Sequence, residues 1–300
     1  MISIVTPSFN QGQFIEETIR SILLQGYANL EYLILDGGST DGSVEIIQKY
    51  APWLTYWVSE PDRGQSDAIN RGLKRASGQF VTWINSDDML CKNALVDHAT
   101  RFGFDKNIVY VGICLYINTL GNVRASHCGR VHSLEDLVRV SAIWRGGGQI
   151  VQPEVLFPRD MALSVGGLDN ANHFTMDYDL WGKLLIQGAK FQYTQIPFGM
   201  FREHPDQKTH HPLRITESLL KTAAQLITLA RCFSEQKKAE LLADLDAYSA
   251  DYQKACWLGT GRLARMGLPR ELVTSLRALR NILHSNKAPT PNTSSTTRAR

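Results

Sequence analysis

The chain has 300 residues and a mass of 33.6 kDa; 43% of its residues are hydrophobic and 20% are charged. This length and composition suffice for one large α/β domain with a buried core, and they exclude wholesale disorder. The formal net charge of +3 argues neither for nor against nucleic acid as a partner. That average hides an asymmetry, because residues 253–300 carry a net charge of +8 and the preceding 252 residues a net charge of −5. We therefore expect an acidic globular body followed by a basic segment.

The first ten residues contain no long apolar run, because polar residues and Pro7 interrupt it, so we expect no signal peptide. No stretch approaches the roughly 18 consecutive apolar residues that a membrane-spanning helix needs. The cysteines are odd in number and include no C-x-x-C pair, which favours reduced, partly buried thiols over a metal site or a disulfide framework. These features predict a cytoplasmic protein. The cysteines are Cys91, Cys114, Cys128, Cys232 and Cys256.

Residues 1–92 alternate strand and helix signals. One helix is expected after Asn10, which could cap it, a second after the loop Asp36–Gly42, and a third between a capping Ser66 and Gly78. This βαβαβαβ order predicts an α/β fold in which helices flank a parallel sheet. The predicted strands are Ser3–Thr6, Leu30–Leu35, Leu54–Val58 and Phe80–Ile84.

The rest of the chain is more mixed. Residues 93–211 contain a predicted strand over Ile108–Ile117, a turn at Gly121-Asn122 and a helix around Asp179 to Gln187. Residues 212–284 are helical in character and would form a C-terminal helical extension. Residues 285–300 are rich in Ser, Thr, Asn and Pro, and we expect them to be disordered.

Three polar clusters follow the predicted parallel strands, at the edge where open sheets bind ligands. They are Thr6-Pro7-Ser8, Asp36-Gly37-Gly38 and Asn85-Ser86-Asp87-Asp88. Each has a purely structural alternative, an Asx turn for Asp36 and helix-entry residues for the paired aspartates. Adjacent carboxylates repel each other, however, and a divalent cation is the usual reason to tolerate them. Because neither a P-loop nor a G-x-G-x-x-G pattern occurs, the residues suggest a metal-bound nucleoside diphosphate held without a P-loop.

The same clusters carry a resemblance to a known family. In order and spacing, the motifs over residues 2–205 resemble the family 2 glycosyltransferases of the GT-A fold. The resemblance implies a Rossmann-like, mixed but mainly parallel sheet flanked by helices, with a nucleotide-sugar-binding half (1–92) and an acceptor-binding, catalytic half (93–211). The motifs are Val5-Thr6-Pro7-Ser8-Phe9-Asn10, Leu35-Asp36-Gly37-Gly38-Ser39-Thr40-Asp41-Gly42, Asp67-Ala68-Ile69-Asn70-Arg71-Gly72, Asn85-Ser86-Asp87-Asp88, Val165-Gly166-Gly167-Leu168-Asp169 and Met176-Asp177-Tyr178-Asp179-Leu180-Trp181.

The resemblance assigns expected roles in nucleotide binding. Asp36 would receive uracil or another base, and Thr6 and Pro7 would line that pocket. Arg71 would reach a phosphate oxygen or else be an ordinary surface residue of a helix. Asn85 and Ser86 belong to the expected nucleotide set, although Asn85 stands where many relatives have an aspartate near the ribose. This departure makes the site less anionic.

The resemblance also assigns expected metal ligands. Asp87 occupies the metal position and would hold Mn²⁺ or Mg²⁺ on the donor diphosphate. Asp88 would be a second ligand or a supporting group. His204 lies in Phe201-Arg202-Glu203-His204-Pro205, which resembles an R-x-H-P segment of some relatives. It would contact the diphosphate, complete the metal shell, or simply be a loop histidine that caps a helix.

Asp177 matches the catalytic base of the family. It would deprotonate the acceptor hydroxyl as that hydroxyl attacks the anomeric carbon, and a single displacement implies inversion. Met176 replaces the more common glutamate, and Asp179 is an alternative that the sequence does not exclude. The chain lacks the Q-x-x-R-W signature of processive relatives, so we expect a hexosyltransferase-type enzyme that transfers a single sugar.

Two other functions stay open. A nucleotidyltransferase usually carries a Gly-rich loop with Lys or Arg after its first strand, and residues 6–10 have neither feature. A non-catalytic nucleotide-sugar-binding assembly protein would be expected to lose Asp87 or Asp177, and both are present.

The expected partners are a UDP- or similar nucleotide sugar and a saccharide or lipid-linked acceptor, in cell-surface polysaccharide or glycolipid synthesis. Nucleic acid is not expected, because no recognition motif accompanies the basic segment. Residues 257–283 interleave apolar residues with arginines, which suits an interfacial helix on anionic lipid at the inner face of a membrane. The alternative is a helix that packs on the catalytic domain with a solvated basic face.

Overall fold

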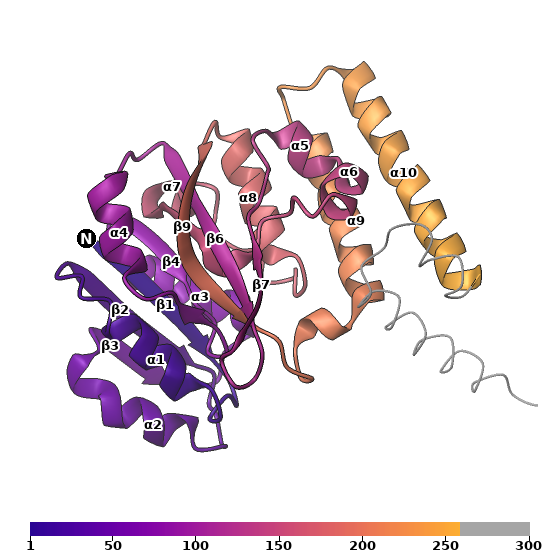
Figure 1. The fold of residues 1–300 in the computed structure, drawn as a ribbon. Coiled ribbons are helices and arrows are strands. Elements are labelled where there is room, and N and C mark those ends of the chain that lie inside the picture. The colour runs from indigo at the N-terminus through magenta and orange to yellow at the C-terminus, as the bar shows by residue number, and fades with distance from the viewer. Residues whose placement is uncertain (259–300) are drawn as a thin grey trace, which may run out of the picture. The chain divides into compact units, whose positions relative to one another are not determined.

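The computed structural model describes residues 1–258, without the side chains of Arg145 and residues 255–258. The chain divides into two compact units, Met1–Tyr248 and Ser249–Arg300, and the second unit is described only as far as Leu258. In the first unit the described strands form one sheet in the order β3-β2-β1-β4-β8-β6-β9-β5, and β7 pairs with β6 (Figure 1).

The N-terminal half of this sheet is parallel, as the alternating pattern predicts. β1, β2, β3 and β4 run in the same direction, and α1, α2 and α3 connect them. The strands are β1 (Ile2–Ser8), β2 (Leu30–Asp36), β3 (Tyr56–Ser59) and β4 (Phe80–Trp83), and the helices are α1 (Ile15–Leu23), α2 (Ser43–Tyr50) with the 3-10 turn Ala51–Trp53, and α3 (Gln65–Arg75).

The C-terminal half makes the sheet mixed. β8 runs antiparallel to both β4 and β6, whereas β9 lies parallel to β6. β5 and β7 add antiparallel pairs to β9 and β6. The prediction of a mixed sheet flanked by helices is confirmed. The strands are β5 (Met89–Leu90), β6 (Ile108–Ile117), β7 (Val123–His127), β8 (Val155–Pro158) and β9 (Lys190–Arg202).

The remaining described helices follow β5 along the chain. α8 and α9 pack together, and α9 lies against the face of the sheet that α8 covers. They are α4 (Ala94–Arg101), α5 (Leu134–Val138), α6 (Val140–Arg145), α7 (Arg159–Ser164), α8 (Met176–Ile186), α9 (Pro212–Leu229) and α10 (Glu235–Leu258), with 3-10 turns at Gln152–Glu154 and Lys208–His210.

Two hydrophobic clusters fill the two faces of the sheet. Alternation along β1 sends Ile4 into the cluster that holds α1 and α4, and Val5 into the cluster that holds α3, α8 and α9. Both side chains are fully buried. Because both faces are covered, only the strand ends and loops remain open to a ligand.

Two predicted helix starts are wrong. α1 begins at Ile15, and Asn10 does not cap it, because its Oδ1 accepts a hydrogen bond from Thr40 N at 2.9 Å. α3 begins at Gln65 after Gly64, whose φ of +104° suits glycine, so Ser66 lies inside the helix. The helix predicted around Asp179 starts earlier, at Met176.

Residues 212–248 belong to the first compact unit. The predicted boundaries at residues 92, 211 and 284 stay predictions. The stretch 257–283, predicted as an interfacial helix, lies outside the described residues except for the backbone of its first two residues. The predicted disordered tail 285–300 lies wholly outside them. Along the described chain, none of the helices combines the length and apolarity that crossing a membrane requires. Cys91, Cys114, Cys128 and Cys232 have free thiols.

Candidate active site

Polar segments follow the carboxyl ends of neighbouring parallel strands. The register places Ser8 of β1 opposite Asp36 of β2, and Asp36 opposite Ser59 of β3. β4 ends at Trp83 and leads into Asn85–Asp88, which we call the acidic loop. Because these strands end at one edge of the sheet, the predicted nucleotide and metal residues share that edge.

Asp36 is buried and held by its own loop. Its Oδ2 accepts hydrogen bonds from Ser39 N at 2.8 Å and Ser59 Oγ at 2.7 Å, and its Oδ1 accepts from Ser39 Oγ at 2.5 Å. Burial alone would raise the pKa of Asp36, but these hydrogen bonds outweigh it and hold the pKa below its usual value. Asp36 is therefore a fixed carboxylate at the strand edge.

The other predicted nucleotide residues have different surroundings. Thr6 is fully buried, and its Oγ1 lies 3.1 Å from the hydroxyl of Tyr32. Pro7 is a buried residue of β1 opposite Leu35. Arg71 of α3 is partly exposed and forms an ion pair with Glu60. Arg71 thus lies on a polar surface of α3. That position agrees with one of the two alternatives for Arg71, an ordinary surface residue of a helix.

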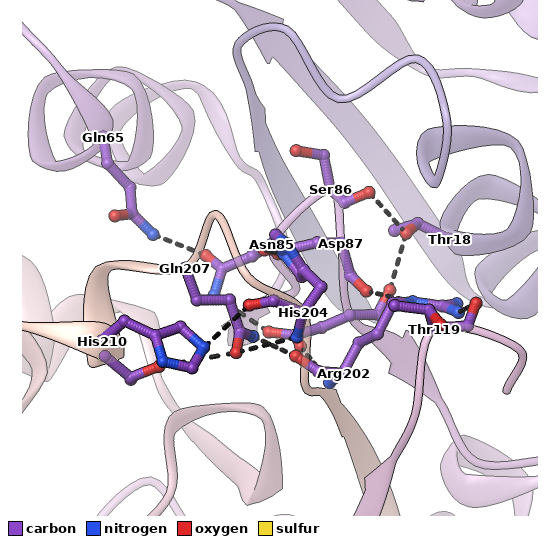
Figure 2. A network of polar contacts seen from close by, with 12 residues as sticks. Thr18, Gln65, Asn85, Ser86, Asp87, Thr119, Arg202, His204, Gln207 and His210 are labelled. Atoms are coloured by element: carbon purple, nitrogen blue, oxygen red, sulfur yellow. Dashed lines mark hydrogen bonds and ion pairs between the residues drawn. The ribbon is translucent and has the colours of Figure 1, made fainter. Parts of the chain in front are cut away.

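The acidic loop is held in place from the side of α1. Thr18 Oγ1 donates to the carbonyl oxygens of Ser86 and Asp88 at 3.0 and 2.6 Å (Figure 2). Ser86 itself is buried. Two fixed carbonyls, one on each side of Asp87, therefore define the course of the backbone at that residue.

Asp88 turns into the protein. Its Oδ1 accepts from Arg202 N at 2.9 Å, and its Oδ2 accepts from Asn85 Nδ2 at 3.0 Å. Burial, and then the adjacent Asp87 charge, raise the pKa of Asp88 well above its usual range. Both oxygens already have donors, which favours the supporting role over that of a second metal ligand.

Asp87 and His204 come together across 117 residues of sequence. His204 Nε2 lies 3.0 Å from Asp87 Oδ2, and part of the Asp87 carboxylate is exposed. The His204 ring is buried and packs on Phe14 with 4.8 Å between centroids. Its Nδ1 has no hydrogen-bond partner among the described residues. Asp87 and His204, two of the predicted metal ligands, are thus close enough to each other to bind the same ion.

These residues fit a divalent cation only together with the substrate. In the described part of the chain, no three His, Cys, Asp or Glu side chains gather closely enough to hold a metal by themselves. Mg²⁺ commonly takes one or two protein ligands and completes its shell with water and substrate phosphates, and Mn²⁺ accepts the same oxygen ligands. Asp87 supplies an oxygen ligand of this kind, and His204 would add an imidazole nitrogen, which lies outside the oxygen set that these ions prefer.

Arg202 is a site residue that sequence reasoning missed. Its side chain is fully buried; Nε donates to Asp87 O at 2.8 Å and Nη1 to Thr119 O at 3.0 Å. Nη2 pairs with Glu17 at 2.5 Å. Arg202 is the last residue of β9, and His204 follows two residues later. The end of β9 therefore contacts the acidic loop twice, through the Arg202 side chain and through His204 (Figure 2).

The first turn of α3 contacts two parts of the site. Gln65 Nε2 donates to Asn85 Oδ1 at 2.7 Å, and Ser66 Oγ donates to Met176 Sδ at 2.9 Å. Met176 is the first residue of α8, and Asp177 follows it. This turn of α3 therefore links the acidic loop to the start of the helix that carries Asp177.

The carboxylates of Asp177 and Asp179 differ in the partners that balance their negative charge. Asp177 is partly exposed, its Oδ1 accepts only a local hydrogen bond from Tyr178 N at 2.8 Å, and burial raises its pKa to about 6. Asp179 forms an ion pair with Lys183 at 2.5 Å. Burial also raises the pKa of Asp179, although Lys183 opposes this, so Asp177 differs from it in having no cationic partner among the described residues.

Solved structures show the class of fold. The chain matches Staphylococcus aureus TarS (residues 1–349, crystallised with UDP-GlcNAc) with a TM-score of 0.61 and 18% identity, over 81% of this chain and 71% of that one. The first compact unit therefore has the GT-A glycosyltransferase fold.

Sequence comparisons support the family. Residues 3–141 match the family model described as Glycosyl transferase family 2. An uncharacterized glycosyltransferase of Rickettsia typhi is 27% identical over 62% of this chain and 58% of its own length. The putative teichuronic acid biosynthesis glycosyltransferase TuaG of Bacillus subtilis is 36% identical over 32% of this chain and 39% of its own. The chain thus spans less than two thirds of the length of these relatives, and its residues 3–141 are similar to glycosyltransferase family 2.

Proposed function

We propose that the protein transfers one sugar from a nucleoside diphosphate sugar to an acceptor hydroxyl with inversion at the anomeric carbon. The observation that carries the proposal is the pairing of Asp87 with His204 at the sheet edge, with the uncompensated carboxylate of Asp177 linked to the same loop through α3. The family match and the fold likeness to a protein crystallised with UDP-GlcNAc support a nucleotide-sugar donor.

In this proposal the strand ends bind the nucleotide. Asp36 is an ionised acceptor for a base N–H, with Thr6 and Pro7 behind it. Asn85 and Ser86 lie next to the diphosphate, and Arg71 would leave Glu60 to reach a phosphate. Because Asp36 is already fixed by Ser39 and Ser59, it reads the base without reorganising.

Asp87 and His204 would hold Mn²⁺ or Mg²⁺ on the diphosphate, and Asp88 would support the loop. When bound, the cation stabilises the negative charge that develops on the leaving diphosphate. Arg202 and Thr18 fix the backbone of Asp87, so that its carboxylate is presented in one position.

Asp177 accepts the proton of the acceptor hydroxyl in this mechanism. The oxygen then attacks the anomeric carbon from the face opposite the leaving nucleotide, and one such displacement inverts the configuration. Asp179 is the less suitable base in this proposal, because its carboxylate is already paired with Lys183.

The proposed setting is the synthesis of a cell-surface polysaccharide or glycolipid by hexosyl transfer, at the cytoplasmic side. The name of TuaG supports a polysaccharide role, because that relative is assigned to teichuronic acid biosynthesis. The basic charge of residues 253–300 supports contact with an anionic membrane that carries a lipid-linked acceptor.

The base assignment predicts the behaviour of Asp177→Asn. Nucleoside diphosphate release from a panel of nucleotide sugars with Mn²⁺ should fall by about 100-fold or more, because general-base catalysis contributes at least that much. Binding of the donor, measured by calorimetry, should be unchanged. In the wild-type protein, the rate should fall as the pH drops below about 6, where Asp177 becomes protonated.

Asp179→Asn is the matched control, because it changes the same chemical group two residues away. It should keep most of the turnover, and thermal unfolding of both variants checks that they fold. Loss of turnover in Asp179→Asn with full turnover in Asp177→Asn would refute the base assignment. Absence of diphosphate release from every donor, with tight nucleotide binding, would favour a binding protein.

A further inference from the structure

Lys208 reaches the acidic loop through two amide side chains. It begins the 3-10 turn Lys208–His210 after β9, and its Nζ donates to Gln65 Oε1 at 2.7 Å. The Gln65 Nε2 in turn donates to Asn85 Oδ1 at 2.7 Å (Figure 2). Because Asn85 uses the amide N–H of Gln65, the carbonyl of Gln65 is the atom left to face the lysine.

The ammonium of Lys208 lacks the carboxylate partner that Lys49 and Lys183 have. Lys49 and Lys183 lie 2.7 and 2.5 Å from carboxylates of Glu16 and Asp179. Over residues 1–258, no carboxylate lies within ion-pairing distance of Lys208, whose hydrogen-bond partner is the neutral Gln65. Lys208 is an exposed residue, but the protein atoms around its ammonium still lower the pKa of Lys208, and the nearby Asp87 charge opposes this.

The surrounding segment holds Lys208 at this place. Gln207 Nε2 donates to Arg202 O, and His204 N donates to Gln207 Oε1 at 3.3 Å. His210 Nε2 lies 3.0 Å from His204 O. Residues 202–210 are therefore folded onto themselves beside the Asp87–His204 pair, and Lys208 lies close enough to Asp87 for their charges to interact.

We propose that Lys208 is a donor-binding residue whose ammonium contacts the diphosphate of the nucleotide sugar, and that Gln65 and Asn85 position it in the unliganded protein. The inference rests on the proposed function. A neutral amide releases a lysine more readily than a carboxylate would, and the new bond to phosphate is charge-assisted and stronger. The flexible four-carbon stem of lysine permits the short movement.

The test is calorimetry on the full-length protein with Mn²⁺ and two probes, inorganic pyrophosphate and UDP. Lys208→Gln should weaken the binding of both by about 10- to 100-fold, the range for losing a hydrogen bond to a charged group. Uridine, which lacks phosphates, should bind equally to both proteins. Lys208→Arg should recover most of the affinity, and Lys221→Gln, an exposed lysine of α9, should match the wild type.

Equal affinity of Lys208→Gln and wild type for pyrophosphate and UDP would overturn the inference, as would the absence of binding of both probes by the wild type. Turnover of a nucleotide sugar together with equal affinity would overturn the inference and leave the proposed function standing. Lys208-dependent pyrophosphate binding without turnover of any donor would contradict the proposed function and support the assignment of Lys208.

Discussion

At the scale of single residues, Arg202 illustrates how the site is held. A buried cation is tolerated only where its hydrogen bonds are satisfied, and this guanidinium has acceptors in three directions: Asp87 O, Thr119 O and Glu17. The rigid fork of arginine supplies such divergent donors, which the ammonium of lysine does not reproduce. Its ring neighbour Phe14, 4.9 Å from the guanidinium carbon, closes the remaining side.

Arg202→Met should lower the free energy of unfolding by about 3 kcal/mol, because Asp87 O and Thr119 O lose a charged donor and Glu17 loses its ion-pair partner. Glu17→Gln should cost less than about 1 kcal/mol, since Glu17 is exposed and the amide oxygen of glutamine can still accept from Arg202 Nη2. Urea denaturation measures both values. Turnover of Arg202→Met should also need more Mn²⁺, because the backbone of Asp87 is no longer fixed. Equal losses of stability in the two variants would contradict this account.

Local motifs predicted where single residues lie but not which residues they meet. The strand-end position of Asp36 and Asp87 follows from hydrophobic runs that stop at polar clusters. The contact of Asp87 with His204 depends on β9 pairing with β5 and β6, and no local pattern contains it. Gln65 and Lys208 carried no sequence signal, because an isolated glutamine or lysine at a helix or loop position is ordinary.

At the scale of elements, α3 depends on one glycine to reach the sheet. A methyl group on Gly72 would overlap Val5 Cγ1 and lie 2.8 Å from its Cγ2. Val5 is buried and β-branched, so it has little freedom to move away. The close approach of α3 to β1 places Gln65 and Ser66 within hydrogen-bonding distance of the acidic loop and of α8.

Gly72→Ala should therefore destabilise the protein, although alanine favours the helix by about 1 kcal/mol. Overpacking of a buried contact costs about 1–3 kcal/mol, and we expect this cost to exceed the gain in helix propensity. Lys74→Ala, on the exposed side of the same helix, is the control and should be neutral or slightly stabilising. Urea denaturation distinguishes the two; a Gly72→Ala variant as stable as the wild type would refute the packing argument.

The parallel half of the sheet could be predicted from the sequence, whereas β9 could not, because their patterns of apolar residues differ. Strands β1, β2 and β4 are short apolar runs between turn residues, which is the strand signature. β9 contains Pro197 and has φ of +56° at Gln195, and its pairing with β6 shifts register between Tyr193 and Pro197. Such a bulge breaks the alternation of apolar residues on which prediction of a strand depends.

At the scale of the whole molecule, two fully buried titratable groups outside the predicted site set the pH dependence of stability. Glu154 is completely buried and accepts hydrogen bonds from Val151 N at 3.0 Å and Cys114 N at 3.2 Å. Burial outweighs these bonds and raises its pKa to about 8. Burial lowers the pKa of His98 to about 4, in a cage that includes Phe102, Phe104 and Tyr110.

These two pKa shifts change the free energy of unfolding with pH in opposite directions. Glu154 binds a proton more tightly in the folded state, so its contribution to stability falls as the pH rises from about 4.5 to 8. His98 binds a proton less tightly when folded, so its contribution rises with pH and is complete above 6.5. The two effects oppose each other below pH 6.5, and of these two groups only Glu154 titrates between pH 6.5 and 8.

The free energy of unfolding should therefore fall between pH 6.5 and 8, by about 1 kcal/mol per pH unit. Glu154→Gln removes one titrating group and should therefore make this slope clearly shallower, whatever its effect on stability at a single pH, because an amide does not titrate. Urea denaturation of both proteins at pH 6.5, 7.25 and 8 measures the slopes. A wild-type stability that is flat or rises over this range would show that the buried Glu154 is ionised at neutral pH, and its three backbone N–H donors would then outweigh its burial.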